Sequence, residues 1–250
     1  DLGDVGTPAK ETLDPGDATA KYLAPIATAC RRVAKLVRSA LDDGRVPVVL
    51  GGDHSCAIGT VAGVAAHFRK SKRQAGIIWV DAHGDMNTPQ STQSGNVHGM
   101  PLAVLLGMGP KELTELDFKG PKIDPTRAVL VGIRDLDRDE REIVATSGAT
   151  VFSISEIDER GIAAVMRDAI RIARGPSGDG AYHVSFDLDG VDPQFAPGVG
   201  TAVEGGITYR EAHLAMELVA VDGGMSSVEM VEINPILDVG NRTGRLAMEL

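Results

Sequence analysis

Six short runs of apolar and β-branched residues recur along the chain, most of them separated by segments with helical periodicity. The runs are Val46–Leu50, Gly76–Val80, Arg127–Ile133, Thr150–Ile154, Tyr182–Phe186 and Ser227–Val231. They are continuously apolar rather than alternating, which is typical of strands whose two faces are both covered. Because helical segments separate them, the pattern predicts a mostly parallel central sheet between two layers of helices, a three-layer α/β fold.

Two other segments have distinctive compositions. The first 17 residues are rich in Gly, Pro, Asp and Thr and are predicted to form a loop, followed by a helix from about Ala18 to Leu41. The segment from Asp81 to His98 follows directly on a predicted strand and contains many Gly, Asn, Pro, Ser and Thr residues. That composition is typical of a functional loop rather than a packed element.

Length, charge and cysteine content limit the class of protein. A chain of 250 residues with 43% hydrophobic residues predicts one globular domain over residues 1–250. The net charge of −10 disfavours binding to nucleic acid or to an anionic membrane. No apolar run reaches the roughly 18 residues of a membrane span and no signal-like segment opens the chain, so a cytoplasmic location is expected. Cys30 and Cys56 lack a paired spacing and are expected to be free thiols.

Acidic residues and histidines follow three of the predicted strands. Within an open parallel sheet, ligands bind beyond the carboxyl ends of the strands. Alternate residues of an extended chain point to the same side, so each motif can present its acidic and imidazole groups together. One Asp-x-His motif alone is commonly a structural hydrogen bond, but three such motifs at strand ends favour a metal site. The motifs are Gly51-Gly52-Asp53-His54-Ser55, Asp81-Ala82-His83-Gly84-Asp85 and Asp187-Leu188-Asp189.

Four aspartates and two histidines make up the predicted ligand set, His54, Asp81, His83, Asp85, Asp187 and Asp189. Crowded together without cations, the carboxylates would raise one another's pKa values, whereas two divalent cations would neutralise all four. Oxygen ligands combined with two imidazoles favour Mn²⁺ over Zn²⁺, Mg²⁺ or Ca²⁺, with Co²⁺, Fe²⁺ and Ni²⁺ as alternatives. Two ions that share a water would supply a bridging hydroxide as nucleophile, so the pattern predicts a hydrolysis.

The other candidates for ligands are interpreted as structural. His67, His183 and His213 lie in helical or strand contexts without ligand partners at a useful spacing. Asp53 is interpreted as a carboxylate that either orients the neighbouring His54 imidazole or closes the Gly-Gly turn.

The motifs, taken together, resemble the signatures of the ureohydrolase superfamily, the arginase/agmatinase family. Within it the arginase branch is most similar, because Asn87-Thr88-Pro89 and Ser94–Pro101 resemble the loop that reads the amino-acid end of the substrate. The resemblance implies an arginase-like fold and hydrolysis of L-arginine to L-ornithine and urea. It covers most of the chain from Pro47 onward, through Gly51–Ser55, Asp81–Pro101, Ser185–Pro193, Gly200–Glu211 and Val231–Pro235.

The resemblance also implies roles at individual positions. The six predicted ligands match the residues that hold two manganese ions per chain. Asn87 and Ser94 match residues that bind the α-carboxylate of the substrate, with Thr92 and Asn96 adding water-mediated contacts. Asp137 matches the acceptor for the α-ammonium group.

At the reacting end of the substrate, the resemblance implies four further roles. Glu232 matches the carboxylate that holds the guanidinium group, a pairing that suits a fork-shaped cation, and Thr201 matches a polar residue in the wall beside it. Asp85 is implied to accept a proton from the bridging hydroxide and to pass it to the leaving nitrogen. His98 matches a loop histidine that relays protons to solvent or to product.

Three alternatives remain open. A ureohydrolase acting on agmatine or guanidinobutyrate is disfavoured by Asn87, Ser94 and Asp137. An amide hydrolase of the related deacetylase group typically uses one Zn²⁺, which the second histidine, His54, and the complete Asp-x-His-x-Asp motif disfavour. A non-catalytic subunit is disfavoured because none of the predicted ligands is lost.

The resemblance also leads to expectations about the ends of the chain and about its assembly. Family members begin with an additional strand and continue past the last helix, so relative to them this chain is expected to be short at both ends. Because they typically form trimers or hexamers, the resemblance implies a homo-oligomer.

Overall fold

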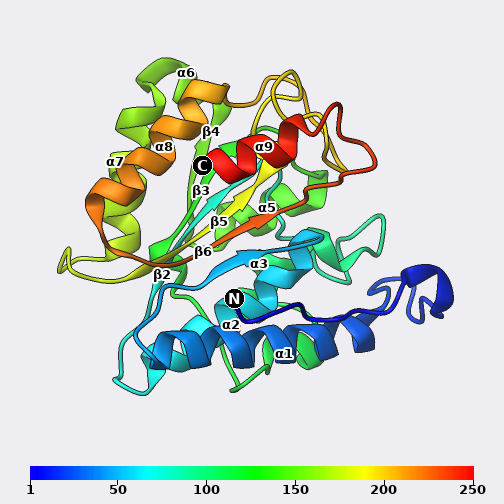
Figure 1. Cartoon of the computed structure of the whole chain (residues 1–250). Coiled ribbons are helices and arrows are strands. Elements are labelled where there is room, and N and C mark those ends of the chain that lie inside the picture. The colour runs from blue at the N-terminus through cyan, green and yellow to red at the C-terminus, as the bar shows by residue number, and fades with distance from the viewer.

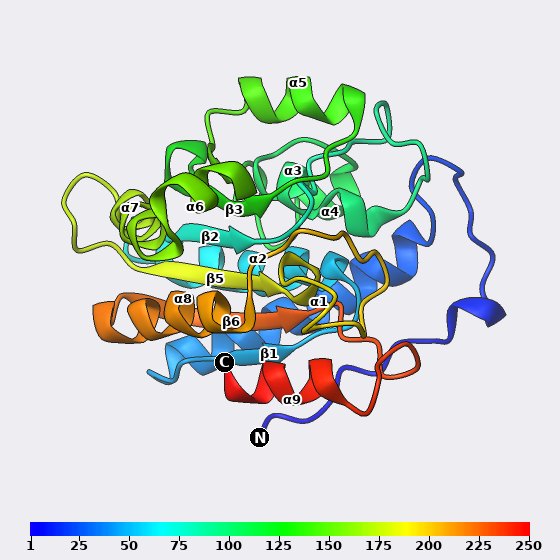
Figure 2. The ribbon, with the colours of Figure 1, turned by 90° about the horizontal axis from the view of Figure 1, so that it is seen from above.

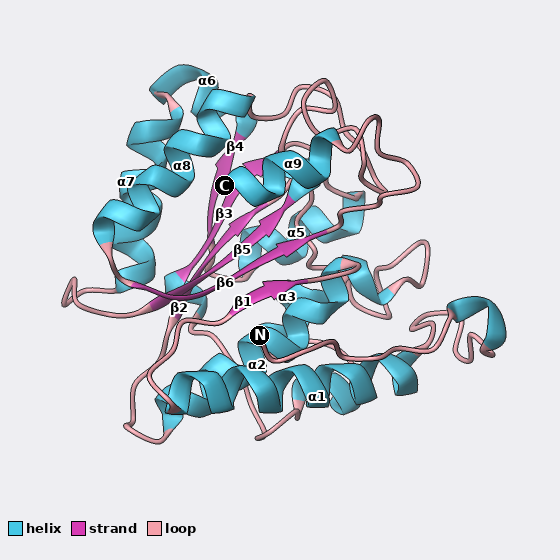
Figure 3. Ribbon diagram, in the orientation of Figure 1, coloured by secondary structure: helices cyan, strands magenta, loops and turns pink.

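A single six-stranded sheet, in the order β1-β6-β5-β2-β3-β4, runs through the computed structural model, which describes residues 1–250 (Figures 1 and 3). All neighbouring strands run parallel. The six predicted strands are all present, and none of their bounds shifts by more than two residues. They are β1 (Val48–Leu50), β2 (Gly76–Val80), β3 (Ala128–Ile133), β4 (Thr150–Ser153), β5 (Tyr182–Asp187) and β6 (Met225–Val231).

Helices cover both faces of the sheet, which confirms the predicted three-layer fold (Figure 2). On one face α2, α3 and α5 pack against Ile77 and Trp79 of β2, and on the other α6, α7, α8 and α9 share a core with Ile78 and Val80. Alternate side chains of this fully buried strand therefore fill two different cores. The helices are α1 (Leu23–Asp42), α2 (Ala57–Arg69), α3 (Pro101–Leu105), α4 (Lys111–Thr114), α5 (Arg138–Thr146), α6 (Ile154–Arg160), α7 (Ile162–Arg174), α8 (Tyr209–Asp222) and α9 (Arg242–Glu249).

The first helix begins later than its periodicity predicts, at Leu23 rather than at about Ala18. Tyr22 has a left-handed backbone with φ 57°, which a helix does not continue through. The preceding turn is held by a distant segment, because Lys21 N donates to the carbonyl of Gly95 at 2.9 Å. Long-range contact with the loop after β2 therefore overrides local helical preference here.

Features away from the sheet agree with the remaining predictions. The segment before α1 contains only one short 3-10 turn, Lys10–Thr12. Cys30 and Cys56 are both free thiols. None of the helices combines the length and apolar character that crossing a bilayer requires.

The order of the strands reverses between β5 and β2, and this point positions the site. From β2 the chain continues to β3, whereas from β5 it continues to β6 on the opposite side. Val80 pairs with Phe186, so Asp81 and Asp187 leave two adjacent strands at the same level. In open α/β sheets such a reversal is the usual place for a ligand, beyond the carboxyl ends of the strands.

Candidate metal centre

The first histidine of the site sits in a short 3-10 turn, His54–Cys56, which follows β1. Asp53 caps this turn, since its carboxylate accepts a hydrogen bond from the backbone N–H of Ser55 at 2.9 Å. Its hydrogen bonds thus match neither interpretation of Asp53 fully, because they close the turn that follows Gly51-Gly52 and do not reach the His54 ring. The imidazole of His54 is oriented by other groups.

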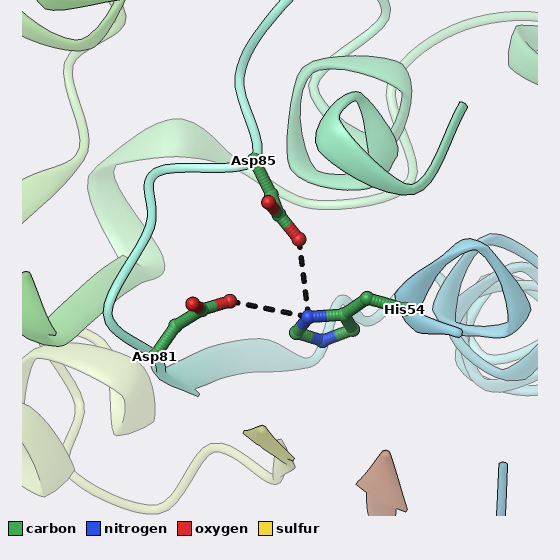
Figure 4. A group of neighbouring side chains, drawn as sticks. All are labelled: His54, Asp81 and Asp85. Atoms are coloured by element: carbon green, nitrogen blue, oxygen red, sulfur yellow. Dashed lines mark ion pairs between the residues drawn. The ribbon is translucent and has the colours of Figure 1, made fainter. Parts of the chain in front are cut away.

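Three carboxylates surround the Nδ1 atom of His54. The nearest oxygens of Asp81, Asp85 and Asp187 lie 3.1, 3.0 and 3.0 Å from it. Figure 4 shows the Asp81 and Asp85 side chains pointing toward the same ring nitrogen. All of these groups are buried, so the cluster is closed to bulk solvent on this side.

A second group forms around His83 and shares one ligand with the first. The Nδ1 atom of His83 lies 3.1 Å from Oδ2 of Asp189 and 3.4 Å from Oδ1 of Asp81. Asp81 thus presents Oδ1 to His83 and Oδ2 to His54. Potential ligand atoms lie within 4.8 Å of one another in the set His54, Asp81 and Asp85 and in the set Asp81, His83 and Asp189, and Asp187 joins the first set through its 3.0 Å approach to His54. The structure therefore brings all six predicted ligands together, as two groups joined by one carboxylate.

The arrangement around His54 fits a cation better than a set of hydrogen bonds. Its Nδ1 atom is buried and has no hydrogen-bond partner of acceptable geometry, although three carboxylate oxygens are close. Octahedral ligands about 2.1 Å from an ion lie about 3 Å from one another, which is the spacing seen here. Carboxylate oxygens and imidazole nitrogens are the donor set that divalent ions of intermediate hardness prefer. The residues present therefore fit two divalent cations.

Electrostatics in the metal-free cluster support the same conclusion. Burial, followed by the charge of Asp81, raises the pKa of Asp85 to about 8. Burial and the negative charges of neighbouring carboxylates also raise the pKa of Asp187 well above its usual range. For His83, burial lowers the pKa, but hydrogen bonds to Asp189 and Asp81 outweigh it and raise the value to about 12. Without cations, bound protons must therefore balance the negative charge of the cluster.

Trp79 supports two of the ligands and was not identified from the sequence. Its ring stacks on the His54 imidazole at 3.9 Å between centroids and 6° between planes. Its Nε1–H donates to Oδ2 of Asp81 at 2.9 Å. A signal was available, because Trp79 stands two residues before Asp81 and alternate residues of a strand share a face.

Two of the predicted catalytic residues have a left-handed backbone. Asp85 has φ 52° and Glu232 has φ 65°, a region that residues other than glycine rarely occupy. Both are fixed by backbone hydrogen bonds, from Leu102 N to the Asp85 carbonyl at 3.0 Å and from Glu232 N to the Gly52 carbonyl at 2.8 Å. Such conformations concentrate at functional sites, where the surrounding structure holds them in place.

Glu232 stands at the end of β6 and connects it to the turn after β1. Its Oε1 accepts a hydrogen bond from the backbone N–H of His54 at 2.8 Å. Burial raises the pKa of Glu232 to about 7, although the hydrogen bond from His54 opposes the shift. The Glu232 carboxylate therefore lies beside the cluster. It is not one of the carboxylates that approach Nδ1 of His54 or Nδ1 of His83.

The residues predicted to read the amino-acid end of the substrate are only partly assembled. Asn87 Nδ2 donates to Oδ2 of Asp137 at 3.1 Å, so these two side chains meet between the loop after β2 and the start of α5. Ser94 is exposed and its hydroxyl accepts from the backbone N–H of Asn96 at 3.1 Å. Thr92 similarly accepts from a backbone N–H within its own loop. Ser94, Asn96 and Thr92 hydrogen-bond through these groups to their own loop only.

Glu140 is a second residue that sequence reasoning missed. This buried carboxylate accepts from Met86 N at 2.8 Å and from Asp137 N at 3.2 Å. It therefore joins the loop that carries Asp85 to the start of α5, where Asp137 is the N-cap residue. The spacing Asp137-x-x-Glu140 is a capping-box pattern and could have indicated this helix start.

The last two predicted residues are Thr201 and His98. Thr201 donates its hydroxyl to Oδ2 of Asp189 at 2.9 Å, so it contacts a proposed metal ligand directly. His98 is partly buried in the 3-10 turn Val97–Gly99. Burial lowers its pKa, which favours the neutral imidazole that a proton relay requires near neutral pH.

Comparisons with known proteins point to one family. The model of the arginase family matches residues 2–250. An arginase from Bacillus caldovelox is 46% identical over 251 aligned residues, which cover 100% of this chain and 82% of the relative. An arginase from Bacillus subtilis is 45% identical, covering 100% of this chain and 81% of the relative. The solved structure of the Bacillus caldovelox arginase aligns with a TM-score of 0.93 at 45% identity, over 99% of this chain and 81% of that one.

Proposed function

The chain belongs to the arginase family, and on this premise we propose that it hydrolyses L-arginine to L-ornithine and urea with two manganese ions. Its reaction class is hydrolysis of a linear amidine C–N bond. The observation that supports the proposal most directly is the pair of ligand groups around His54 and His83, which share Asp81. Such a shared carboxylate would hold two ions close enough to act on one water.

The proposed ligands are the six residues of the cluster, and the preference for manganese rests on their chemistry. Carboxylate oxygens predominate, no thiolate takes part, and each group contains one imidazole. Co²⁺, Fe²⁺ and Ni²⁺ suit the same donors and are the alternatives to be tested. Two divalent ions bound here would polarise the substrate and lower the pKa of a shared water, making it a nucleophile at neutral pH.

Glu232 is proposed to orient the guanidinium group for attack. Its carboxylate lies beside the cluster, and a bidentate pair with the planar cation would fix the reacting carbon toward the space between the two histidine groups. Thr201, which donates to Asp189, is proposed to line the same end of the site. The hydrogen bond from His54 N to Oε1 of Glu232 supports a carboxylate that is in place before substrate arrives.

Asp85 and His98 are proposed to move the protons that the reaction requires. The nearest carboxylate oxygen of Asp85 lies 3.0 Å from Nδ1 of His54, next to the position proposed for the ions, so Asp85 suits transfer of a proton from the shared water to the leaving nitrogen. His98 is partly exposed and its pKa is lowered by burial, so it can accept and release a proton toward solvent.

The opposite end of the substrate is proposed to bind outside the cluster. Asn87 and Ser94 would bind the α-carboxylate, Thr92 and Asn96 would add water-mediated contacts, and Asp137 would accept from the α-ammonium group. The contact between Asn87 and Asp137 supports this arrangement, since a donor and an acidic acceptor lie 3.1 Å apart. Substrates that lack the α-carboxylate would lose the contacts of Asn87 and Ser94.

We further propose that the chain forms one domain and that it assembles as a homotrimer or homohexamer. We also propose that it acts in the cytoplasm. Apolar side chains exposed after β6 and in α9, notably Ile236 at 93% and Met248 at 87%, support association with another chain. Two free thiols suit a reducing compartment.

A comparison of two substrates tests the proposal. Chelator-stripped protein is incubated with Mn²⁺, with Co²⁺ or without metal, and urea release is measured from L-arginine and from agmatine. We expect Mn²⁺-dependent urea release that strongly favours L-arginine. Agmatine lacks the α-carboxylate but keeps the amine, so a preference for agmatine would contradict the roles of Asn87 and Ser94 while leaving the metal site intact. No urea from either substrate would contradict the proposed activity.

A further inference from the structure

A chain of buried polar groups leads from the back of the His54 ring into the core. The Nε2 atom of His54 lies 2.8 Å from Oγ of Ser185. Ser185 Oγ in turn donates to Oε1 of Glu229 at 2.7 Å. Ser185 and Glu229 are both completely buried. A carboxylate thus contacts the first histidine of the cluster through a single hydroxyl group.

The register of two strands builds this chain. Ser185 on β5 is paired with Glu229 on β6, and His183 is paired with Ser227. The His183 ring lies 3.2 Å from the same Oε1 of Glu229 and 2.8 Å from Ser227 Oγ. Four buried polar side chains of the adjacent strands β5 and β6 therefore lie next to one another. The prediction that His183 is structural agrees with this position in the core.

The directions of the hydrogen bonds determine the protonation of the His54 ring. Burial raises the pKa of Glu229, but the charge and hydrogen bond of His183 outweigh it, so Glu229 is held as a carboxylate and can only accept. The single hydroxyl proton of Ser185 goes to Glu229, and Ser185 therefore accepts from Nε2–H of His54. The lone pair of the neutral ring then lies on Nδ1, facing Asp81, Asp85 and Asp187.

We propose that Glu229, acting through Ser185, is a positioning residue that fixes His54 in the tautomer required for metal binding. The inference rests on the proposed metal site and deepens it. Hydrogen-bonded carboxylates behind a ligating imidazole fix its orientation and increase its basicity. The contacts of the His83 ring are those of its Nδ1 atom with Asp81 and Asp189, and no serine supports its other nitrogen as Ser185 supports His54. The two ions would therefore be held by histidines that differ in their hydrogen bonds. Loss of the polar chain should therefore weaken one ion selectively.

A purely structural role would explain these contacts less well. A buried carboxylate is unfavourable unless its oxygens are all satisfied, and Oε2 of Glu229 has no hydrogen-bond partner. Its bond from Ser185 is shorter, at 2.7 Å, than its contact with His183, at 3.2 Å. An apolar pair at these two positions would give the sheet an equally closed core. The group is therefore best explained by what it does for His54.

Two serines of similar burial provide a matched test. Ser185→Ala removes the hydroxyl that contacts His54. Ser227→Ala removes an equally buried hydroxyl that contacts His183, at the other end of the row of hydrogen-bonded side chains. Chelator-stripped proteins are titrated with Mn²⁺, and free Mn²⁺ is counted by its electron paramagnetic resonance signal. We expect Ser185→Ala to bind one of the two ions about 10–100-fold more weakly and the other as in the parent protein. Ser227→Ala should bind both ions as the parent does, with a similar change in melting temperature.

The position of the weakened ion can be identified with Trp79, the only tryptophan of the chain, which stacks on His54. Quenching of its fluorescence by Mn²⁺ should shift to higher concentration in Ser185→Ala and in Glu229→Gln, and remain unchanged in Ser227→Ala. Equal weakening of both ions, or the same loss in Ser227→Ala, would show a merely structural role and overturn the inference. A parent protein that binds fewer than two ions would instead contradict the proposed metal site.

Discussion

The proposed metal cluster and the loop after β2, which carries Asn87 and Ser94, are built in opposite ways. The proposed ligands of the cluster follow strand ends and are nearly all buried, with His54 at 1% and Asp81 at 0% exposure. In the loop, Ser94 is exposed and bonds only within its own segment, and Asp137, the N-cap residue of α5 that contacts Asn87 of the loop, is exposed as well. The comparison indicates that the reacting end of the site is organised before any ligand binds. The amino-acid end depends much more on the substrate to complete it.

The two regions differ because their supports differ. Parallel strands fix the heights of Asp81 and Asp187 through a continuous ladder of hydrogen bonds. The loop has no such ladder, and its strongest support is Glu140, which holds Met86 N and Asp137 N with its two oxygens. Changes in the cluster should therefore abolish metal binding, and changes in the loop should alter substrate affinity alone.

The largest effect is expected at the ligand that both groups share. Asp81→Asn replaces a carboxylate whose oxygens face His54 and His83 with a neutral amide of the same size. We expect both ions to be lost on dialysis and turnover of L-arginine to fall by about 10³ or more. Bound manganese is measured by elemental analysis, and urea release gives turnover.

A matched control for this variant is Asp53→Asn, which alters an acidic residue close to the cluster that caps a turn and faces no ligand nitrogen. It should retain two ions per chain. Two bound ions in Asp81→Asn, with near-normal turnover, would show that Asp81 is not the shared ligand.

The second prediction concerns the protons that replace the ions. Asp85, with its usual pKa of 3.8 raised to about 8 by burial and by Asp81, stabilises the metal-free fold below pH 4 and loses that contribution as the pH rises to about 8. His83, with its usual value of 6.5 raised to about 12, loses its contribution over a higher range in the same direction. The melting temperature of chelator-stripped protein should therefore fall between about pH 5 and pH 9.

Manganese reverses this trend because it displaces the protons. Its apparent affinity should rise by about tenfold per pH unit for each proton released. Thermal unfolding of stripped and manganese-loaded protein, followed in parallel across this range, should show a gap that widens with pH. A gap that stays constant would mean that the raised groups do not surround the ions.

The contrast between cluster and loop also explains what the sequence could predict. Strands with continuous apolar runs were located to within two residues, and motifs at their ends predicted side chains that the structure brings together. Local pattern sufficed there because Asp81, Asp85 and Asp187 are placed by the strands and turns that carry them. The start of α1 was predicted wrongly because Gly95, far along the chain, holds Lys21 out of the helix.

The supporting residues were missed for a related reason. Trp79 stacks on His54 of a distant segment, and Glu140 and Glu229 act through hydrogen bonds to a distant loop and across strands. Strand order is needed to place Ser185 opposite Glu229, and periodicity alone gives no strand order. Sequence patterns thus identify the groups that contact a ligand more readily than the groups that hold them.

The smallest effect is expected at Asp137, the N-cap residue of α5 that contacts the loop through Asn87. Asp137→Asn removes the negative charge proposed to accept from the α-ammonium group, while the amide oxygen can still accept the bond from Asn87. We expect the KM for L-arginine to rise about tenfold, the loss expected for one charge-assisted hydrogen bond at an exposed position, with two manganese ions still bound. Asp139→Asn, an exposed acid in the same first turn of α5, is the control and should leave the KM unchanged. If Asp137→Asn instead lowered turnover at saturating substrate or released metal, the loop would be part of the cluster, and the division between a preformed end and a substrate-completed end would fail.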